Sequence, residues 1–381
     1  MIKIKSDKII VDDGLFDGYI YIENDKIVEV SSAKKQAETF YDYTGKYVSP
    51  GFIETHTHGA GGYCFINNTV DDVVKACNTH LMHGTTSILP TVTTAKFDVM
   101  AKCVENISKA KKSKDLLANL IGAHLEGPYL SPVQVGAQCP DFITPPNKDE
   151  YIPLIEKFGK DITRWTYAPE EDANAEFCKY LSSHNVIPSA GHTNATYADM
   201  KLAIKNGLQS VTHLYSLTST ITRKQGFRIL GVIETAYLED DIFVEIIADG
   251  KHLPPELIKM IVKIKGADKT IAVTDSLQIA GTNVLEGNLS GIEFIVEEGV
   301  CRLKDRSAFA GSIATSDRLL RVLSKECGYS IPVAVKMLTK TPNELLKLNK
   351  GEIKAGKDAD IIVFDDDICV SDIFVMGKKV K

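Results

Sequence analysis

The sequence predicts an α/β protein made of a (β/α)8 TIM-type barrel and a small β-sandwich domain built from both termini. In the middle of the chain, eight short β-branched runs alternate with amphipathic helical stretches. At both ends, short strands alternate apolar and polar residues around turn signals. We therefore expect the β-sandwich domain over residues 1–49 and 350–381 and the barrel domain over residues 50–349.

The terminal segments are typical of hairpins. The first end contains IKIKSDKIIV, GYIYIENDKIVEV with Asn24 and Asp25 at a turn, and YDYTGKYV. The other end contains DADIIVFDDD and ICVSDIFVMGKKV. Because the two β-rich ends flank a different kind of middle, we expect them to form one domain.

The predicted barrel strands are the runs VSPGFIETHTH, TTSILPTVT, NLIGAHLEG, RWTYAPE, VIPSAGHT, QSVTHLY, VEIIADG and TIAVTDS. Stretches between them, such as residues 71–84 and 254–266, have helical apolar spacing. Residues 127–151, rich in Pro and Gly, are expected to form a long functional loop. A barrel of this kind carries its active site at the C-terminal ends of its strands.

Composition excludes several function classes. The chain has 44 Lys and Arg against 50 Asp and Glu, a net charge of -6, so no global positive field exists to hold nucleic acid or an anionic membrane. An anionic substrate must be held by local cations. The sequence contains neither a signal-peptide core nor eighteen consecutive apolar residues, and we expect a cytoplasmic protein. Its 8 cysteines form no C-x-x-C pair and are expected to be reduced thiols.

Polar residues end several of the predicted strands. His56 and His58 end the first run, and residues two apart on a strand face the same side. Four later runs end in one carboxylate or imidazole each: Glu126, His192, His213 and Asp275. Nitrogen and oxygen ligands without thiols suit zinc or a similar divalent metal, and acid–base chemistry on water.

Each of these residues taken singly has a structural explanation. A lone histidine at a strand end is usually a core or capping residue, Glu126 could be a loop carboxylate, and Asp275 could cap a helix. His124 alternates with Glu126 and could reach the same barrel mouth. We interpret three histidines on the helical stretches as structural: His80, His83 and His184. The joint pattern favours a metal centre.

Several motifs match a known family. They are PGFIETHTHG, GTTSILPT, GAHLEGPYL, SAGHTNAT, TRKQGF, IADGKHL, VTDS, FAGS and, near the end, GEIKAGKDAD. On these the sequence resembles the N-acetylglucosamine-6-phosphate deacetylase family of the amidohydrolase superfamily. The order HLEGP, GHT, THL, ADGxH, VTD is specific to that family, whereas PGFIExHxHG and AGKDAD mark only the superfamily.

The resemblance implies removal of acetate from a phosphorylated N-acetyl amino sugar. Three residues would hold the principal metal: Glu126, His192 and His213. His56 and His58 match the pair that binds a second metal in some members, with Glu126 bridging. Asp275 matches the catalytic acid/base, which takes a proton from water and delivers it to the departing nitrogen. Zinc is the expected ion, with iron or another divalent metal as alternatives, and one or two ions per subunit both stay open.

The resemblance also implies substrate contacts. His252 is the expected hydrogen-bond donor to the developing oxyanion or to the sugar. Arg223 matches the phosphate-binding arginine, which in the family often reaches across a dimer interface, so a homodimer is expected. Its spacing from His213 is one residue short of a common family spacing, and Lys224 is the alternative. One segment is expected to close on the N-acetyl group: Phe309, Ala310 and Gly311.

The sequence departs from the family around the sugar and phosphate. The family's Gly-Ala-His is Gly136, Ala137 and Gln138 here, and its Asn-Ala is Ser216 and Leu217. Gln can donate or accept a hydrogen bond but cannot be charged. We therefore expect the deacetylase chemistry, acting on N-acetylglucosamine 6-phosphate or a relative such as the galactosamine epimer.

Two other functions stay open at this point. One is amidohydrolase chemistry on a cyclic amide or an N-acyl amino acid. Cyclic-amide members commonly carry a carboxylated lysine in the barrel, and no lysine ends a predicted run here. The other is a non-catalytic barrel that serves in assembly or binding, which the intact set of ligands disfavours.

Overall fold

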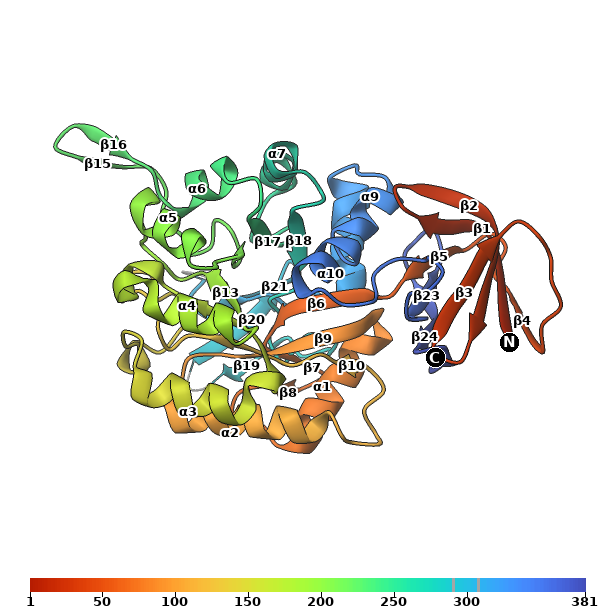
Figure 1. Cartoon of the computed structure of the whole chain (residues 1–381), viewed down its shortest axis with the longest axis horizontal. Helices are drawn as coiled ribbons and strands as arrows, with labels where there is room; N and C mark the ends of the chain where they lie inside the picture. The colour runs from red at the N-terminus through yellow and green to blue at the C-terminus, as the bar shows by residue number, and fades with distance from the viewer. Residues whose placement is uncertain (290–291, 307–308) are drawn as a thin grey trace.

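The structure, a computed structural model of the chain, describes residues 1–289, 292–306 and 309–381. A barrel surrounded by helices occupies most of the molecule, and a β domain lies at one side of it (Figure 1). Both chain termini lie in this β domain.

The β domain contains one eight-stranded sheet, called the terminal sheet below. Its strands are β1 (Ile2–Val11), β2 (Gly14–Glu23), β3 (Lys26–Ser31), β4 (Thr39–Asp42), β5 (Tyr47–Pro50), β23 (Ile361–Phe364), β24 (Val370–Val375) and β25 (Lys378–Lys379). The order is β25-β24-β23-β5-β1-β2-β3, with β4 beside β1. Strands from the two ends of the chain meet where β5 pairs antiparallel with β23. Ile4 and Ile20 from one half share a buried cluster with Ile361 and Phe374 from the other, so the halves enclose a common core.

The barrel strands correspond to the eight predicted runs. They are β6 (Phe52–Thr57), β9 (Thr85–Val92), β10 (Asn119–Leu120), β11 (Ala123–Glu126), β12 (Ile162–Tyr167), β13 (Ile187–Ala190), β14 (Ser210–Val211), β17 (Phe243–Ile247) and β18 (Thr270–Val273). All their pairings are parallel, and β10 and β11 together form the third run. Beyond β18, the ring is joined by two backbone hydrogen bonds of 2.9 Å, Asp275 to His56 and His58 to Ser276.

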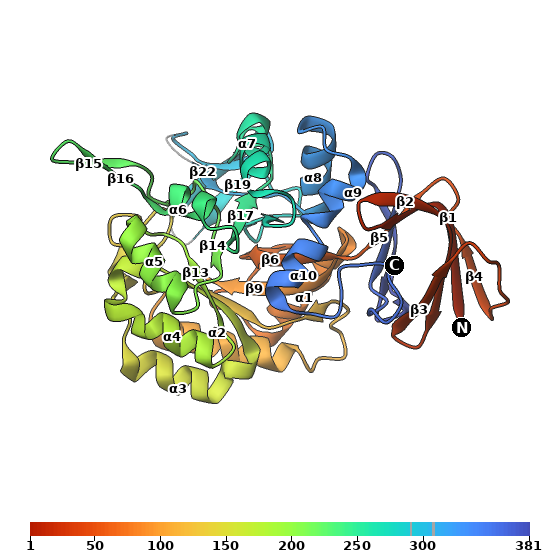
Figure 2. The same cartoon turned by 45° about the horizontal axis from the view of Figure 1, so that its top comes forward.

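Helices follow the strands and cover the barrel (Figures 1 and 2). They are α1 (Val70–Met82), α2 (Phe97–Ala110), α3 (Lys148–Phe158), α4 (Glu176–Ser183), α5 (Tyr197–Lys205), α6 (Val232–Leu238), α7 (Pro255–Lys265), α8 (Ser316–Arg321), α9 (Ile331–Lys336) and α10 (Lys340–Leu346). Helix α1 illustrates the local causes. Thr69 and Asp72 cap its start reciprocally, and Val73, Cys77 and Leu81 form its buried stripe. The predicted barrel is thus confirmed.

Three small sheets were not predicted from the sequence. Strands β7 (Gly59–Ala60) and β8 (Tyr63–Cys64) pair just after β6. Strands β15 (Thr222–Lys224) and β16 (Phe227–Ile229) form a hairpin that extends away from the barrel (Figures 1 and 2). Strands β19 (Glu286–Leu289), β20 (Ile292–Glu297), β21 (Val300–Leu303) and β22 (Phe309–Gly311) form a small sheet after β18. In the described part of the chain, no helix is long and apolar enough to cross a membrane.

Candidate metal centre and active site

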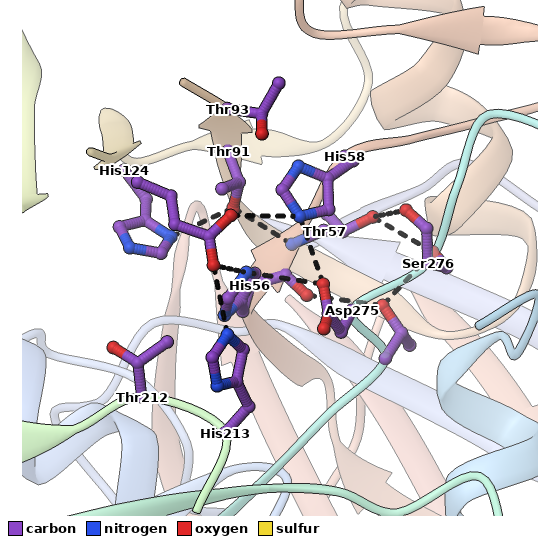
Figure 3. Close-up of polar contacts among 12 residues, drawn as sticks. His56, Thr57, His58, Thr91, Thr93, His124, Thr212, His213, Asp275 and Ser276 are labelled. Atoms are coloured by element: carbon purple, nitrogen blue, oxygen red, sulfur yellow. Dashed lines mark hydrogen bonds and ion pairs between the residues drawn. The ribbon is translucent and has the colours of Figure 1, made fainter. Parts of the chain in front are cut away.

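Six side chains predicted from strand ends converge at one end of the barrel. They are His56, His58, Glu126, His192, His213 and Asp275. Parallel barrel strands all end at the same rim, so residues far apart in the sequence meet there. Figure 3 shows His56, His58, His213 and Asp275 directed toward a common centre.

The first potential ligand group is centred on Glu126 at the end of β11. Its Oε1 lies 3.2 Å from Nε2 of His192 and 3.1 Å from Nε2 of His213. The two imidazole Nε2 atoms are 3.2 Å apart. All three side chains are buried, and their ligand atoms lie within 4.8 Å of one another, so they could hold one ion.

The second group shares Glu126. Nε2 of His56 lies 3.5 Å from Oε1 of Glu126, and Nε2 of His58 lies 3.4 Å from Oε2. Asp275 adjoins this group, with Oδ1 at 3.1 Å from Nε2 of His58. The side chains of His58 and Asp275 each remain 18% exposed, which places them toward the opening of the site.

The chemistry of these donors fits a divalent metal. Among the described residues, Nε2 of His56 is buried without a hydrogen-bond partner although carboxylate oxygens lie nearby. Burial by itself raises the pKa of Glu126, but the surrounding imidazoles, His56 first, hold it well below its usual range. The pKa of Asp275 is likewise lowered, because His56 and His58 outweigh burial. Two carboxylates and four imidazoles are the ligands expected of zinc or a similar ion.

The backbone directs three of these side chains by leaving the extended conformation. The φ angles of His192, His213 and Asp275 are 47°, 28° and 46°, all in a region that non-glycine residues seldom adopt. Each lies two residues beyond the last residue of its strand. Such conformations persist where the surrounding structure imposes them, and they cluster at functional sites.

The residues of the altered Gly-Ala-Gln segment lie beside the centre. Gln138 donates from Nε2 to Oε2 of Glu126 over 2.8 Å, and its Oε1 accepts from Oγ1 of Thr93 over 2.6 Å. Ala137 is exposed on the same loop. Gln138 thus brings a polar group from the segment 127–151 to Glu126, while residues 148–151 of that segment belong to helix α3.

Ser216 and Leu217 lie next to this loop. The backbone N–H of Ser216 donates to the carbonyl of His213 over 2.9 Å. A Cβ atom added to Gly136 would lie 2.0 Å from Cδ1 of Leu217 and 3.5 Å from Cε1 of His192. Leu217 therefore packs against the loop close to the ligand His192.

His252 and the segment of β22 also come together. The ring centroids of His252 and Phe309 are 5.2 Å apart, and Ala310 and Gly311 continue the strand. Nδ1 of His252 lies 2.8 Å from Oδ2 of Asp249. Burial alone lowers the pKa of His252, but the bond to Asp249 outweighs it, and the pKa is raised. A bridge between Ser276 and Ser312 holds this strand beside the Asp275 segment.

Arg223 and Lys224 are not brought to the centre of their own chain. Both are exposed on β15, in the hairpin that extends from the barrel (Figure 1). Within the described residues, the guanidinium of Arg223 makes no hydrogen bond or ion pair with the other predicted site residues.

The remaining histidines have structural surroundings. His124 lies 3.0 Å from Oγ1 of Thr91 through Nδ1 and 2.7 Å from Oγ1 of Thr166 through Nε2, so both of its nitrogens are engaged. Buried His80 contacts Oγ1 of Thr57 and the carbonyl of Gly59. His83 pairs with Asp317 and His184 contacts the carbonyl of Tyr180.

Two buried groups beside the centre were missed from the sequence. Glu54 accepts hydrogen bonds from the backbone N–H of His56 and of Thr274, over 2.9 and 3.1 Å, and burial raises its pKa to about 7. Glu245 lies 3.3 Å from Nδ1 of His56 and pairs with Arg164. For Glu245 the available signal was a single charged residue inside the otherwise apolar strand β17.

Known proteins share this architecture and are similar in sequence over most of the chain. A sequence model of the Amidohydrolase family matches residues 47–381. The N-acetylglucosamine-6-phosphate deacetylase of Lysinibacillus sphaericus is 30% identical over 365 residues, which cover 94% of this chain and 92% of that protein. The N-acetylgalactosamine-6-phosphate deacetylase of Shewanella sp. strain ANA-3 is 29% identical over 340 residues, 89% of this chain and 84% of that protein.

Solved structures of such deacetylases have the same fold as this chain. The N-acetyl-D-glucosamine-6-phosphate deacetylase of Mycobacterium smegmatis superposes with a TM-score of 0.92 at 28% identity, covering 100% of both chains. A mutant of that enzyme in complex with N-acetyl-D-glucosamine 6-phosphate gives a TM-score of 0.91 at 27% identity, covering 100% of this chain and 99% of that one.

Proposed function

The chain belongs to the amidohydrolase family, and on that premise we propose that it hydrolyses the acetamide of an N-acetyl amino sugar 6-phosphate. N-acetylglucosamine 6-phosphate is the foremost substrate, since relatives over nearly the whole chain bear that activity in their names. N-acetylgalactosamine 6-phosphate is the second candidate, because similar relatives act on that epimer. The observation that carries the proposal is the convergence of Glu126, His192 and His213 beside Asp275.

The residues divide into two ligand sets. Glu126, His192 and His213 would hold the principal ion, and His56 and His58 a second ion with Glu126 shared. Zinc suits these imidazole and carboxylate donors best. A divalent ion bound there polarises the acetamide carbonyl and lowers the pKa of water.

The chain's own groups handle the proton and the charge. Asp275, as a carboxylate, takes the proton from the attacking water and passes it to the departing amine nitrogen. His252, held by Asp249, donates a hydrogen bond to the developing oxyanion or to the sugar. Phe309, Ala310 and Gly311 close on the N-acetyl group. Gln138, Ser216 and Leu217, with Ala137, shape the sugar side of the pocket.

Arg223 binds the substrate phosphate in a homodimer, reaching from one subunit into the site of the other. A guanidinium pairs with phosphate through two hydrogen bonds. The hairpin that carries Arg223 also exposes Ile221 at 50% and Phe227 at 76%. Apolar side chains gathered on a projecting hairpin support a protein partner there. Lys224 is the alternative cation.

The test is release of free amine by the metal-replete protein from three substrates. These are N-acetylglucosamine 6-phosphate, N-acetylgalactosamine 6-phosphate and unphosphorylated N-acetylglucosamine. Fastest turnover of the first supports the proposal, and turnover of the galactosamine compound alone would make Gln138, Ser216 and Leu217 the specificity determinants. No release from any of them, with metal bound, would favour another amide. A protein that purifies without stoichiometric metal would favour a non-catalytic barrel.

A further inference from the structure

A buried carboxylate lies inside the barrel next to the proposed second ion site. Glu245 is on β17 and has no exposed surface. Its Oε2 lies 3.3 Å from Nδ1 of His56, and its Oε1 accepts a hydrogen bond from Oγ1 of Thr55 over 2.6 Å. The carboxylate therefore meets the side of the His56 ring opposite to the one that faces Glu126.

A buried arginine holds this carboxylate in place. Arg164 on β12 pairs with Oε1 of Glu245 through Nη1. Its Nη2 donates to Oγ of Ser189 and to Oγ1 of Thr212, each over 2.8 Å. A buried ion pair is weak grounds for stability, because desolvation offsets the attraction. The pair is better explained by the contact of Glu245 with His56.

We propose that Glu245 is a positioning residue for His56, and that through His56 it sets the affinity of the second ion site. As an ionised partner of Arg164, Glu245 can only accept hydrogen bonds, so the proton of the neutral His56 ring resides on Nδ1. This leaves the lone pair of Nε2 directed at the centre, where Nε2 is buried without a hydrogen-bond partner among the described residues. Carboxylates that fix a ligand histidine in this way raise its basicity.

The effect of Glu245 is local to one half of the centre. In the principal group, Nδ1 of His192 lies 3.0 Å from the carbonyl of Gln134, and Nδ1 of His213 has no hydrogen-bond partner in the described residues. Among the described contacts, the Glu245 carboxylate bonds to neither imidazole; only the backbone carbonyl of Glu245 reaches this segment, where it accepts from the N–H of Leu214 over 2.7 Å, and side-chain substitutions retain that carbonyl. The proposal rests on the proposed function only in requiring that two ions bind. It predicts that loss of the Glu245 carboxylate weakens binding of the second ion and leaves the affinity for the principal ion unchanged.

Two matched variants separate the hydrogen bond that position 245 accepts from His56 from the ion pair between Glu245 and Arg164. Removing only one charge of a buried pair leaves the other uncompensated and risks unfolding, so both variants carry Arg164→Met. One adds Glu245→Gln, which keeps an oxygen able to accept from Nδ1, and the other adds Glu245→Leu, which does not. Zinc titration should show the second ion bound about 10–100-fold more weakly in the Leu variant than in the Gln variant. The principal ion should keep its affinity in both.

Equal zinc affinities in the two variants would overturn the proposal. So would a loss shared by both ions, which a general packing defect produces, or a wild-type protein that binds one ion per chain. If the Leu variant does not fold, nitrogen NMR of the wild-type protein shows which ring nitrogen of His56 carries the proton. The His56 signals are assigned as those that disappear in His56→Gln. A proton on Nδ1 of His56 in the metal-free protein is the expected result, and an Nδ1 without a proton contradicts it. Neither readout uses deacetylation, so failure of the proposed substrate is distinguishable.

Discussion

Gln138 donates a hydrogen bond from Nε2 to Oε2 of Glu126 over 2.8 Å, which ties the loop after β11 to the carboxylate that both ligand groups share. The other end of the amide is fixed, because Oε1 accepts from Oγ1 of Thr93 and from the backbone N–H of Thr94. The amide therefore orients Glu126 from a position that the sequence assigns to substrate binding. Substitutions at Gln138 should change metal binding as well as specificity.

We expect Gln138→Leu to weaken zinc binding by about 10–100-fold, since Oε2 of Glu126 loses its hydrogen-bond donor. Turnover at limiting zinc should fall and should recover when zinc is in excess. Zinc titration and amine release over a range of zinc concentrations measure both effects. Thr93→Val, which removes one bond that orients the amide but leaves the amide itself, is the matched control and should have a smaller effect. An unchanged zinc affinity with a raised KM would instead support a pure substrate contact.

Asp275→Asn should keep the metal and lose turnover by about 10²–10⁴-fold, because an amide cannot shuttle the proton. Metal content by elemental analysis and amine release under saturating substrate separate the two effects. Retained metal with turnover within tenfold of wild type would remove Asp275 from the proton transfer.

The fold was predictable where the sequence pattern reports burial. The eight barrel runs are β-branched and apolar because parallel barrel strands are buried on both faces. Helix α1 is recognisable in the sequence from its capping residues and its stripe of apolar residues. The hairpin of β15 and β16 carries no such pattern. Residues 220–228 are all exposed, so nothing constrains their alternation. The strands β19 to β22 pair with one another and lie outside the alternation of strand and helix that marks the barrel, so that alternation does not predict them.

The site was predictable where a motif places a ligand at a strand end. His56, Glu126 and His213 were named from such positions, and the rim brings them together. Arg164 and Glu245 were not, because neither stands at a strand end, and the sequence alone does not distinguish a charged residue within a strand that faces the barrel interior from one that faces solvent. The bond from Gln138 to Glu126 depends on the path of a long loop, which the sequence pattern does not specify.

Arg223→Ala should raise the KM for the phosphorylated substrate and leave unphosphorylated N-acetylglucosamine nearly unaffected, because only the former offers a phosphate to pair with the guanidinium. Steady-state kinetics on the two substrates measure this. Equal losses on both would indicate a structural role for the hairpin. Lys224→Ala is the matched control from the same strand, and a larger effect there would assign the phosphate to Lys224.

Mixing subunits tests whether Arg223 acts across the dimer. Each hybrid of an Arg223→Ala subunit with an Asp275→Asn subunit contains one complete site if the arginine comes from the partner. Random reassembly should then restore up to about a quarter of wild-type activity under conditions where each variant alone is nearly inactive. Activity that stays at the sum of the two variants would place Arg223 in the site of its own chain, or show that no dimer forms.

His80 should make the protein lose stability as the pH falls. Burial lowers its pKa from 6.5 to about 4, and it outweighs the hydrogen bond between Nε2 and the carbonyl of Gly59, which by itself raises the pKa. Below about pH 6.5 His80 binds a proton in the unfolded chain, whereas in the folded protein it stays neutral down to about pH 4. The contribution of neutral His80 to the free energy of unfolding is therefore fully present above pH 6.5 and is lost as the pH falls from 6.5 to 4. A shift of this size corresponds to about 3 kcal/mol in the free energy of unfolding.

The comparison of wild type with His80→Gln isolates this effect, because Gln keeps a donor for the Gly59 carbonyl but does not titrate. Denaturant unfolding of the chelator-treated proteins from pH 7 to pH 4 should show a steeper loss of stability for wild type than for His80→Gln. His184→Gln, which removes an exposed imidazole, is the control and should follow wild type. Parallel curves for wild type and His80→Gln would mean that His80 is protonated in the folded protein at the same pH as in the unfolded chain, and that its burial carries no acid sensitivity.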